Sequence, residues 1–441
     1  MTDAFPIRPV SEGEFPAFYA VPEHAFNSSR PTQPALEHEL VTFEPHRSLA
    51  AFDGASIVGT AVAYSFRMTV PGSLTGVGGV SAVSVLPTYR RRGILSALMR
   101  RQLADIRENG EAVAALCASE PGIYGRFGYG CASEQLRLAI RRGEGLLAPP
   151  FAVPAPGSAP GSAPDPDQDP DQGAAPGPAQ GQVRIRAAEP DQSRPELAKV
   201  YDAVLPHRPG MMTRDERWWT SALADPEWAR RGSSPLRGIV AEDNSGPRGY
   251  ALYSAQPDWG EDGVPAGILT IRELVSADPA ATAAIWRDLL SRDLIAEVRA
   301  RLRPVDDPVL QLLADRRRAR AYLTDGLWVR LTDVQAALTQ RRYAREVDVV
   351  IDVTDELIPA NSGRWRLQAG GLADPAPRCE RAAGHADIAL GVHALGAAYL
   401  GGTRLGALAA AGQVAEPRPG AIAVLSAAMS WDPAPWCPVI F

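Results

Sequence analysis

The strongest constraint on the fold is a segment that divides the chain, residues 148–182, which reads APPFAVPAPGSAPGSAPDPDQDPDQGAAPGPAQGQ. It consists mainly of small residues, prolines and short tandem repeats, and its only charges are four aspartates. Such a sequence cannot bury enough apolar surface to offset the entropy of ordering, and proline interrupts regular backbone pairing. We predict either a disordered linker or an expanded surface loop, with folded units before and after it.

Length and composition are those of a multidomain globular protein. With 441 residues, the chain is long enough for about three domains. Charged residues make up 22% and hydrophobic residues 45%, which is ordinary for globular chains. The net charge of −6 argues against a nucleic-acid partner. Because the sequence shows neither a signal peptide nor a run of about 18 apolar residues, we expect a cytoplasmic protein without a membrane partner.

The cysteines and histidines give no sign of a metal site. The four cysteines are Cys117, Cys131, Cys379 and Cys437, and none forms a C-x-x-C pair. The six histidines form no H-E-x-x-H motif. Buried or free thiols in a reducing cytoplasm are the simplest interpretation, and we expect no metal cofactor.

Residues 1–147 are typical of a mixed α/β unit, because strand and helix patterns alternate. Strands are predicted within residues 48–71 (around a turn at Asp53 and Gly54), 74–87, 112–119 and 134–142. A helix is predicted over residues 93–109, since apolar side chains recur there at helical spacing. These side chains are Ile94, Leu95, Leu98, Met99, Leu103 and Ile106.

The same order of elements recurs in residues 183–332. Strands are predicted within residues 182–189, 236–243, 249–256, 266–277 and 294–302, and helices within residues 193–205 and 278–293. Here the chain passes from strand to helix through VSADPAAT, where Asp278 is a predicted N-cap and Pro279 occupies the first helical position. This second unit therefore has a helix start that lacks arginine and glycine.

Residues 333–441 form a third region of different character. Residues 346–371 are rich in strand formers, and the Ala/Gly-rich residues 394–412 predict packed helices. The chain ends SWDPAPWCPVIF, which is apolar and aromatic to its last residue. Because chain termini are usually polar and frayed, this ending predicts a docked C-terminus.

The stretch VSVLPTYRRRGILSALMRR, residues 83–101, places three arginines and a glycine between a strand and a helix. A helix N-terminus carries unpaired N–H groups, glycine permits close approach of a ligand, and arginine donates bidentate hydrogen bonds to phosphate. The pattern R-x-x-G, from Arg90 to Gly93, thus suits a pyrophosphate. It matches neither the G-x-G-x-x-G nor the Walker A motif. By itself it is equally compatible with a solvated basic turn.

A strand followed by R-R-x-G-x-L and a helix resembles the acetyl-CoA site of the GNAT acetyltransferase superfamily. Together with CASEPGIYGRFGYG (residues 117–130), and above all its octapeptide IYGRFGYG, the stretch resembles the Eis (enhanced intracellular survival) family of N-acetyltransferases. The resemblance implies an α/β (α+β) chain of three domains. They are a catalytic GNAT domain (1–147), a GNAT-like domain without a cofactor site (183–332) and a sterol-carrier-protein-like domain (333–441).

The resemblance also assigns residues to acetyl-CoA, the expected co-substrate. In GNAT enzymes the strand pairs with the pantetheine amides as an added strand would, and the turn wraps the pyrophosphate. The corresponding residues are Val83, Ser84 and Val85 in the strand, Arg91, Arg92, Gly93, Ile94, Leu95 and Ser96 in the turn, and Ser119 and Glu120 beyond the next strand. The strand is expected to be buried in any case, and Glu120 would equally suit a helix N-terminus.

Two catalytic residues are implied, Tyr124 and Phe441. A phenol (pKa ~10) can protonate a departing thiolate (pKa ~8.5), so Tyr124 is the expected general acid, with Tyr129 as a second candidate or a packing residue. The resemblance makes the C-terminal carboxylate of Phe441 the general base. An α-carboxyl of pKa ~3.5 needs an apolar pocket or a bridging water for this role. The alternative is a hydrophobic tail that only packs.

The expected function is acetyl transfer from acetyl-CoA to a primary amine of a small molecule or a lysine side chain. Asn27, Ser28, Val439 and Ile440 stand where aminoglycoside-modifying relatives carry acidic residues. This argues against aminoglycosides and leaves a less cationic amine or a protein lysine as the acceptor, which the sequence does not identify further. The alternative from another class is a non-catalytic acyl-CoA or lipid-binding sensor. The resemblance further implies a homo-oligomer, specifically a hexamer built as a trimer of dimers.

Overall fold

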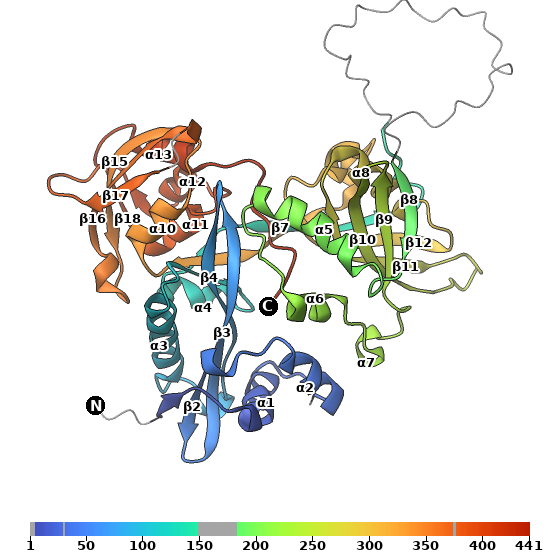
Figure 1. Cartoon of the computed structure of the whole chain (residues 1–441), viewed down its shortest axis with the longest axis horizontal. Helices are drawn as coiled ribbons and strands as arrows, with labels where there is room; N and C mark the ends of the chain where they lie inside the picture. The colour runs from blue at the N-terminus through green and yellow to red at the C-terminus, as the bar shows by residue number, and fades with distance from the viewer. Residues whose placement is uncertain (1–4, 30, 149–182, 374–375) are drawn as a thin grey trace, which may run out of the picture.

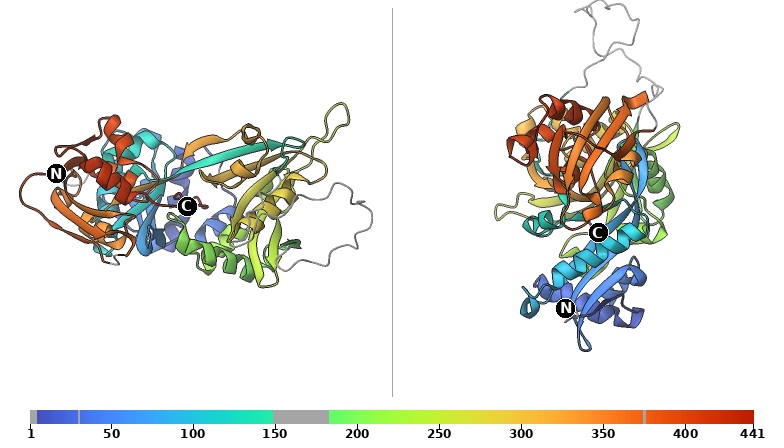
Figure 2. Two further views of the ribbon diagram at one scale, coloured as in Figure 1. Left: turned by 90° about the horizontal axis from the view of Figure 1, so that it is seen from above. Right: turned by 90° about the vertical axis from the view of Figure 1, so that its left-hand side faces the viewer.

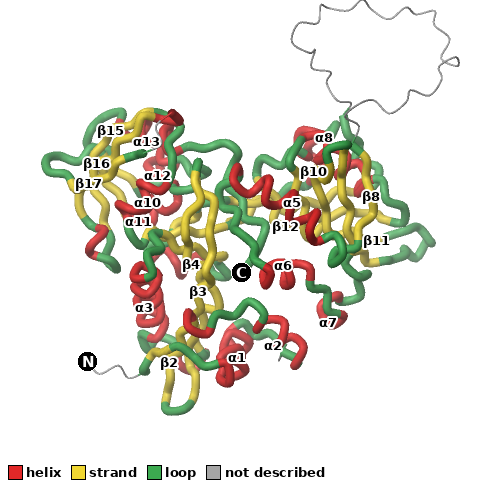
Figure 3. The backbone as a smooth tube through the Cα atoms, viewed as in Figure 1, coloured by secondary structure: helices red, strands yellow, loops and turns green. Residues whose placement is uncertain are grey.

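The computed structural model describes residues 5–29, 31–148, 183–373 and 376–441. The predicted linker or loop, residues 148–182, lies outside the described residues except for Ala148. Three β-sheets organise the described chain, each with helices packed against it (Figure 1), and Figure 3 shows the strands and helices by colour. The predicted mixed α/β class is confirmed.

The first unit is built around the long hairpin of β3 and β4, which turns at Pro71 and Gly72. In the described chain its sheet has the strand order β1-β2-β3-β4-β5-β14-β6. The strands are β1 (Ile7–Arg8), β2 (Ser48–Asp53), β3 (Ser56–Val70), β4 (Ser73–Val85), β5 (Val113–Cys117), β6 (Gly130–Cys131) and β14 (Leu327–Leu331). The helices are α1 (Phe15–Ala25), α2 (Gln33–Leu40), α3 (Ile94–Glu108) and α4 (Pro121–Tyr124).

Helix α3 forms where the apolar spacing predicts it and covers one face of this sheet. Its side chains Ile94, Leu98, Met99 and Leu103 are buried, because a 3.6-residue period brings them to one stripe of the helix. Gly93 is the N-cap in a left-handed conformation, with φ of +83°. Glycine adopts this conformation without the steric cost of a Cβ, so the chain turns sharply from β4 into the helix.

The second unit repeats this layered plan. Its described sheet has the order β13-β7-β12-β11-β10-β9-β8. The strands are β7 (Glu134–Arg141), β8 (Arg184–Ala188), β9 (Arg237–Asp243), β10 (Gly246–Gln256), β11 (Gly267–Ser276), β12 (Ile295–Pro304) and β13 (Tyr322–Asp325). The helices are α5 (Arg194–Val204), α6 (Glu216–Leu223), α7 (Glu227–Arg230), α8 (Pro279–Leu290) and α9 (Val309–Leu312). Asp278 caps α8 as predicted, accepting a hydrogen bond from the N–H of Ala281 at 2.8 Å.

The first two units exchange strands. The strand predicted within residues 134–142 exists as β7, but it pairs antiparallel with β12 and β13 of the second sheet. In return β14, which follows the second unit in sequence, lies between β5 and β6 of the first sheet, with Val329 opposite Ala115 and Trp328 opposite Cys131. Each of the two sheets therefore contains a strand that comes from beyond its own run of the sequence.

The third unit packs against the first. Its described sheet has the order β17-β16-β15-β18-β19. The strands are β15 (Glu346–Thr354), β16 (Gly363–Gly370), β17 (Arg378–Arg381), β18 (Ile388–Gly391) and β19 (Val414–Ala415). The helices are α10 (Val334–Gln340), α11 (Val392–Ala398), α12 (Leu405–Ala410) and α13 (Ala421–Met429). One continuous apolar cluster contains buried side chains of both units, which fixes their relative position.

The C-terminal tail leaves the third unit after α13 and runs back to the middle of the molecule. The C-terminus lies there among the units in Figure 1 and in both views of Figure 2. Trp436 and Cys437 are buried, Phe441 is half-buried and Ile440 is 64% exposed. No described helix has the length and apolar character needed to cross a membrane.

Candidate active site

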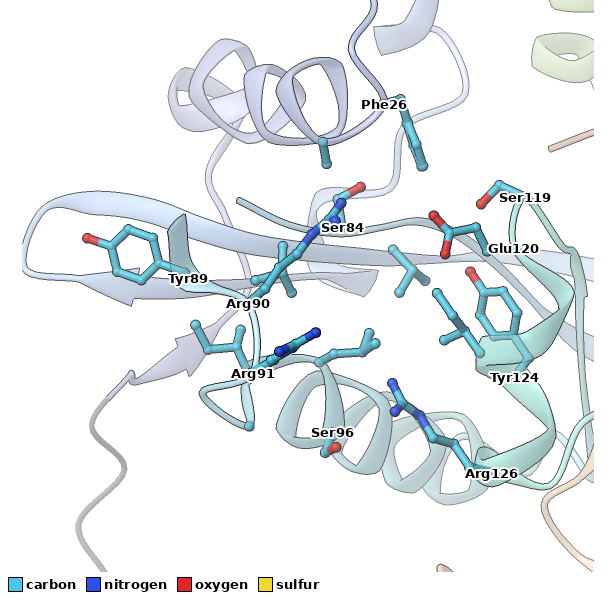
Figure 4. A pocket seen from close by; sticks show the side chains of 17 residues that line it. Phe26, Ser84, Tyr89, Arg90, Arg91, Ser96, Ser119, Glu120, Tyr124 and Arg126 are labelled. Carbon is cyan, nitrogen blue, oxygen red and sulfur yellow. The ribbon is translucent and has the colours of Figure 1, made fainter. Parts of the chain in front are cut away.

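A cavity of about 440 Å³ lies between the end of β4, the start of α3 and the segment after β5. Figure 4 shows the side chains that line it. The structure brings together here most of the residues predicted from the sequence: Val83, Ser84, Val85, Arg91, Gly93, Ile94, Leu95, Ser96, Ser119, Glu120 and Tyr124. Arg92 and Phe441 are not among the lining residues.

The cavity exists because β4 and β5 separate. They pair in parallel only over residues 77–79 and 113–115, and the described pairing of β4 beyond Gly79 is with β3 alone. On the side of β5, the backbone groups of Val83 and Val85 are thus left without a strand partner among the described residues. Ser84 is 5% exposed, and its Oγ has no hydrogen-bond partner there. Buried polar groups normally have partners, so this strand end suits a ligand that can hydrogen-bond to it.

The arginine turn forms the basic wall of the cavity. Arg90 and Arg91 line it, whereas the guanidinium of Arg92 lies over the ring of Tyr89, 4.8 Å from its centroid. A Cβ on Gly93 would meet nothing within 4 Å, so the approach to the first amides of α3 is open. Arg126 from the IYGRFGYG octapeptide adds a third lining cation, whose role the local sequence did not indicate. Three guanidinium groups at a helix N-terminus favour a polyanion.

Tyr124 closes the opposite side of the cavity. It ends α4 and is 6% exposed, and Figure 4 shows its hydroxyl pointing toward Glu120. Burial raises the pKa of Tyr124 above its ordinary value, while a hydrogen bond with the Ser119 side chain acts to lower it and the charge of Glu120 acts to raise it. The net effect keeps the phenol protonated and able to donate a proton into the cavity.

The glycines of the octapeptide admit residues from later parts of the chain. Gly128 has φ of +82°, and a Cβ there would lie 2.7 Å from Nε of Arg330 on β14. A Cβ on Gly130 would lie 2.0 Å from the carbonyl oxygen of His393 on α11. The segment that holds Tyr124 is thus packed directly against β14 and the third unit, and only glycine fits at these positions.

The C-terminal residue reaches the same region from the other side of β4. The ring of Phe441 packs edge-to-face on Phe66 of β3, with centroids 5.1 Å apart, and a Cβ on Gly79 would lie 3.2 Å from it. The thiol of Cys117 donates to the carbonyl of Val439 at 3.9 Å, and the backbone of Phe441 acts to lower the pKa of the same thiol. Cys117 ends β5, only two residues before Ser119 of the cavity. The chain end therefore lies beside the point where β4 and β5 diverge.

A second cavity of about 210 Å³ adjoins the first, since Phe26 lines both. Helices α1 and α2 and the strands β3 and β4 form it. It is lined by aromatic side chains and by the carboxylates of Glu23 and Glu39. Burial, followed by the charge of Glu39, raises the pKa values of Tyr19 and Tyr64 in its wall. Aromatic faces combined with carboxylates are the chemistry that binds a cationic amine.

Comparison with protein-family models agrees with the three units. Residues 6–132 and residues 210–331 each match a model described as an acetyltransferase (GNAT) domain. Residues 334–438 match a model described as a sterol carrier protein domain. The fold and the first cavity thus define an acetyltransferase of the GNAT class. Enzymes of this class use acetyl-CoA.

Comparison with individual proteins narrows the class. An uncharacterized N-acetyltransferase of Streptomyces avermitilis is 43% identical over 396 residues, covering 90% of this chain and 89% of the relative. N-acetyltransferase Eis of Mycobacterium tuberculosis is 33% identical over 366 residues, with coverages of 82% and 80%. The crystal structure of Eis1 from Mycobacterium abscessus superposes with a TM-score of 0.78 at 30% identity, covering 99% of this chain and all of that one. The chain belongs to the Eis family of N-acetyltransferases.

Proposed function

We propose that this protein transfers the acetyl group of acetyl-CoA to a primary amine, which it binds in the second cavity. The observation that carries the proposal is the separation of β4 from β5 beside a basic helix start, with Tyr124 across the same cavity. The chain is an N-acetyltransferase by family. Two adjoining cavities support a proposal in which acetyl-CoA binds in the first and the amine in the second.

Several residues suit the parts of acetyl-CoA. The unpaired backbone of Val83 and Val85 and the Ser84 hydroxyl could hydrogen-bond to the pantetheine amides. Arg90 and Arg91, with the amides at the start of α3, would bind the pyrophosphate. Held in this way, the thioester supplies the acyl group for transfer, and its carbonyl carbon would face the junction between the cavities.

Tyr124 is the proposed general acid. When the amine forms its bond to the acyl carbon, the carbon–sulfur bond breaks and the CoA sulfur leaves with the electron pair. The raised pKa of the buried Tyr124 keeps its proton available for that sulfur at neutral pH. Tyr129 is a weaker candidate, because its hydroxyl is fully buried in the described structure and does not line the cavity.

The carboxylate of Phe441 is the proposed general base, taking the proton that the amine loses. Its support is the docked tail, which brings the last residue to Phe66, Gly79 and Cys117. Phe441 is half-buried and its ring packs on Phe66, and desolvation raises the basicity of a carboxyl group. A water molecule could relay the proton where direct contact is not made.

The acceptor proposed is a cationic amine rather than a neutral one. Asn27 and Ser28 carry no carboxylate and favoured a less cationic amine, but Glu23 and Glu39 line the second cavity. A small volume of about 210 Å³ favours one aminoalkyl group at a time, such as a lysine side chain or one end of a polyamine. The rest of the acceptor would remain outside the cavity.

The test is CoA release from acetyl-CoA, followed with a thiol reagent, against polyamines, aminoglycosides and lysine peptides. Wild type is compared with Tyr124→Phe and with a chain lacking Phe441. We expect turnover with at least one cationic amine and loss of turnover in both variants. Turnover in neither wild type nor variants, with acetyl-CoA still bound in calorimetry, would instead support a non-catalytic acyl-CoA sensor.

The hexameric state stays a prediction from the family resemblance. Light scattering coupled to size exclusion measures it directly, because a hexamer of 47.0 kDa chains differs sixfold in mass from the monomer. A monomer or a dimer would contradict the prediction.

A further inference from the structure

The C-terminal tail does not reach the catalytic unit directly; it first crosses the second unit. Residues 205–213, between α5 and α6, run beside the end of β3. The N–H of Thr69 donates to the carbonyl of Met211 at 2.8 Å, and the N–H of Gly210 donates to the carbonyl of Thr69 at 2.7 Å. The same segment also binds the C-terminal tail, because the N–H of Trp436 donates to the carbonyl of Pro209 at 2.7 Å.

An ion pair of the second unit binds both backbone polar groups of one tail residue, the N–H and the carbonyl of Ala434. The guanidinium of Arg208 donates to the carbonyl of Ala434 at 2.7 Å, and a carboxylate oxygen of Asp306 accepts from the N–H of Ala434 at 3.0 Å. Arg208 and Asp306 also pair with each other at 2.7 Å. The side chains of Arg208 and Asp306 are 15% and 33% exposed, so these charge-assisted bonds are partly shielded from water.

Trp436 fills the core of the second unit. It is 4% exposed and belongs to the same apolar cluster as Leu205 and Met211, and its indole N–H donates to the carbonyl of Leu302. Gly210, with φ of +92°, makes room for it, because a Cβ there would lie 2.9 Å from the Trp436 carbonyl oxygen. A single buried aromatic anchor of this kind fixes a segment firmly.

We propose that the second unit is a binding site for the C-terminal tail. In this site Arg208, Asp306 and Trp436 are positioning residues for the carboxylate of Phe441. Phe441 follows Trp436 by five positions, a reach of at most about 17 Å, so the anchor limits where the chain can end. The inference rests on the proposed role of that carboxylate as the general base. It also gives a purpose to a GNAT-like unit whose helix α8 begins at Asp278 and Pro279 instead of an arginine–glycine turn.

The first experiment measures steady-state turnover of Arg208→Ala beside Arg230→Ala. Arg230 is a matched control, because it pairs with Asp225 in the same unit at comparable exposure. We expect Arg208→Ala to lower kcat on the order of tenfold or more, with KM for acetyl-CoA changed less than twofold, since misplacing a reacting group chiefly affects the chemical step. The control should retain wild-type kcat. Equal kcat in Arg208→Ala and wild type would overturn the proposal.

The same substitution is then made in a chain that lacks Phe441. Removing Phe441 leaves a carboxylate on Ile440, one residue short of the position that the anchor sets. A residue that acts by placing the Phe441 carboxylate has then lost its target, so Arg208→Ala should not lower the residual rate further. A further loss of tenfold would show a general structural role and would contradict the positioning role.

A readout independent of turnover is the rate at which a carboxypeptidase releases Phe441, followed by mass spectrometry. We expect faster release in Arg208→Ala, Asp306→Ala and Trp436→Phe than in wild type and in Arg230→Ala. Trp436→Phe keeps a ring in the core and loses the N–H, so it serves if a charge variant fails to fold. An unchanged rate of Phe441 release in all three variants would overturn the proposed tail-binding site. Faster release of Phe441, combined with full turnover in the chain lacking Phe441, would support the tail-binding site and reject the role of the Phe441 carboxylate as general base.

Discussion

At the scale of single residues, the clearest contrast is between Tyr124 and Tyr129. Their rings pack edge-to-face with centroids 6.0 Å apart, and burial raises the pKa of both phenols. Tyr124 lines the cavity, whereas the Tyr129 hydroxyl is buried without a hydrogen-bond partner among the described residues. Access to the cavity therefore distinguishes the two tyrosines, whereas the direction of the pKa shift does not.

Replacing each tyrosine by phenylalanine tests this contrast. General acids typically contribute a factor of about 10²–10⁴, so Tyr124→Phe should lower kcat by at least about 10². Tyr129→Phe removes only an unsatisfied hydroxyl, and its kcat should stay within about threefold of wild type because no partner is left unpaired. The measurement is CoA release at saturating acetyl-CoA. A larger loss of kcat in Tyr129→Phe than in Tyr124→Phe would identify Tyr129 as the general acid instead.

The pKa of Tyr124 also predicts the pH dependence of turnover. Its acid form donates the proton, and burial places its pKa above the ordinary value of about 10. The acid form is therefore fully populated at neutral pH and is lost only as the pH rises through that higher value. We expect a profile of kcat without a Tyr124-dependent fall between pH 7 and pH 9. A falling limb in that range that is absent in Tyr124→Phe would contradict this assignment.

At the scale of elements, β14 is tied to the third unit by one buried ion pair. Arg330 and Asp355 are 0% and 2% exposed in their side chains and form bonds of 2.8 and 2.7 Å. Asp355 also accepts from Asn361 at 2.9 Å and from the backbone N–H of Ile358 at 3.1 Å. Because Arg330 lies against Gly128, this pair supports the segment that carries Tyr124.

Asp355→Ala should therefore destabilise the protein strongly. It leaves the Arg330 charge buried and unpaired, which typically costs about 3–5 kcal/mol of the free energy of unfolding. Asp348→Ala is the matched control, because Asp348 pairs with Arg366 on the surface and such pairs contribute less than about 1 kcal/mol. Urea unfolding followed by circular dichroism measures both. Similar values for the two variants would show that the buried pair has no special role.

Most elements could be predicted from the sequence because their signals are local. The apolar spacing in residues 93–109 predicted α3, and the turn at Asp53 and Gly54 predicted the hairpin of β2 and β3. The sheet to which β7 belongs could not be predicted. Its alternating pattern specifies a strand with one buried face, and this pattern is the same in either sheet.

The residues of the candidate site, like the elements, could be predicted only where their signals are local in sequence. The strand and turn are neighbours in sequence and the octapeptide is one continuous motif, so local patterns supplied most of the lining residues. Glu23 and Glu39 were missed, because only the packing of α1 and α2 beside β3 and β4 brings them to one cavity. Arg126 was part of a recognised motif, but a local pattern does not specify which way its side chain points, and the structure shows it lining the cavity. The predicted domain limits, 1–147, 183–332 and 333–441, remain predictions.

At the scale of the whole molecule, the exchange of β7 and β14 joins the first two units into one cooperative system. Residues 1–147 alone would lack β14, so β5 and β6 would have no connecting strand, and β7 would have no sheet. We expect this fragment to show no cooperative thermal transition in calorimetry, whereas the full chain should show one. A fragment that unfolds cooperatively and binds acetyl-CoA would contradict the expectation.

The exchange also has a consequence during synthesis. The ribosome completes β5 and β6 early, but β14 emerges roughly 200 residues later, which at about 5–20 residues per second is a delay of about 10–40 s. Throughout that interval the edge of β5 is open to pairing with another chain. Nascent copies of this protein should therefore depend on chaperones, and on spacing between ribosomes, more than a chain of three independently folding domains would.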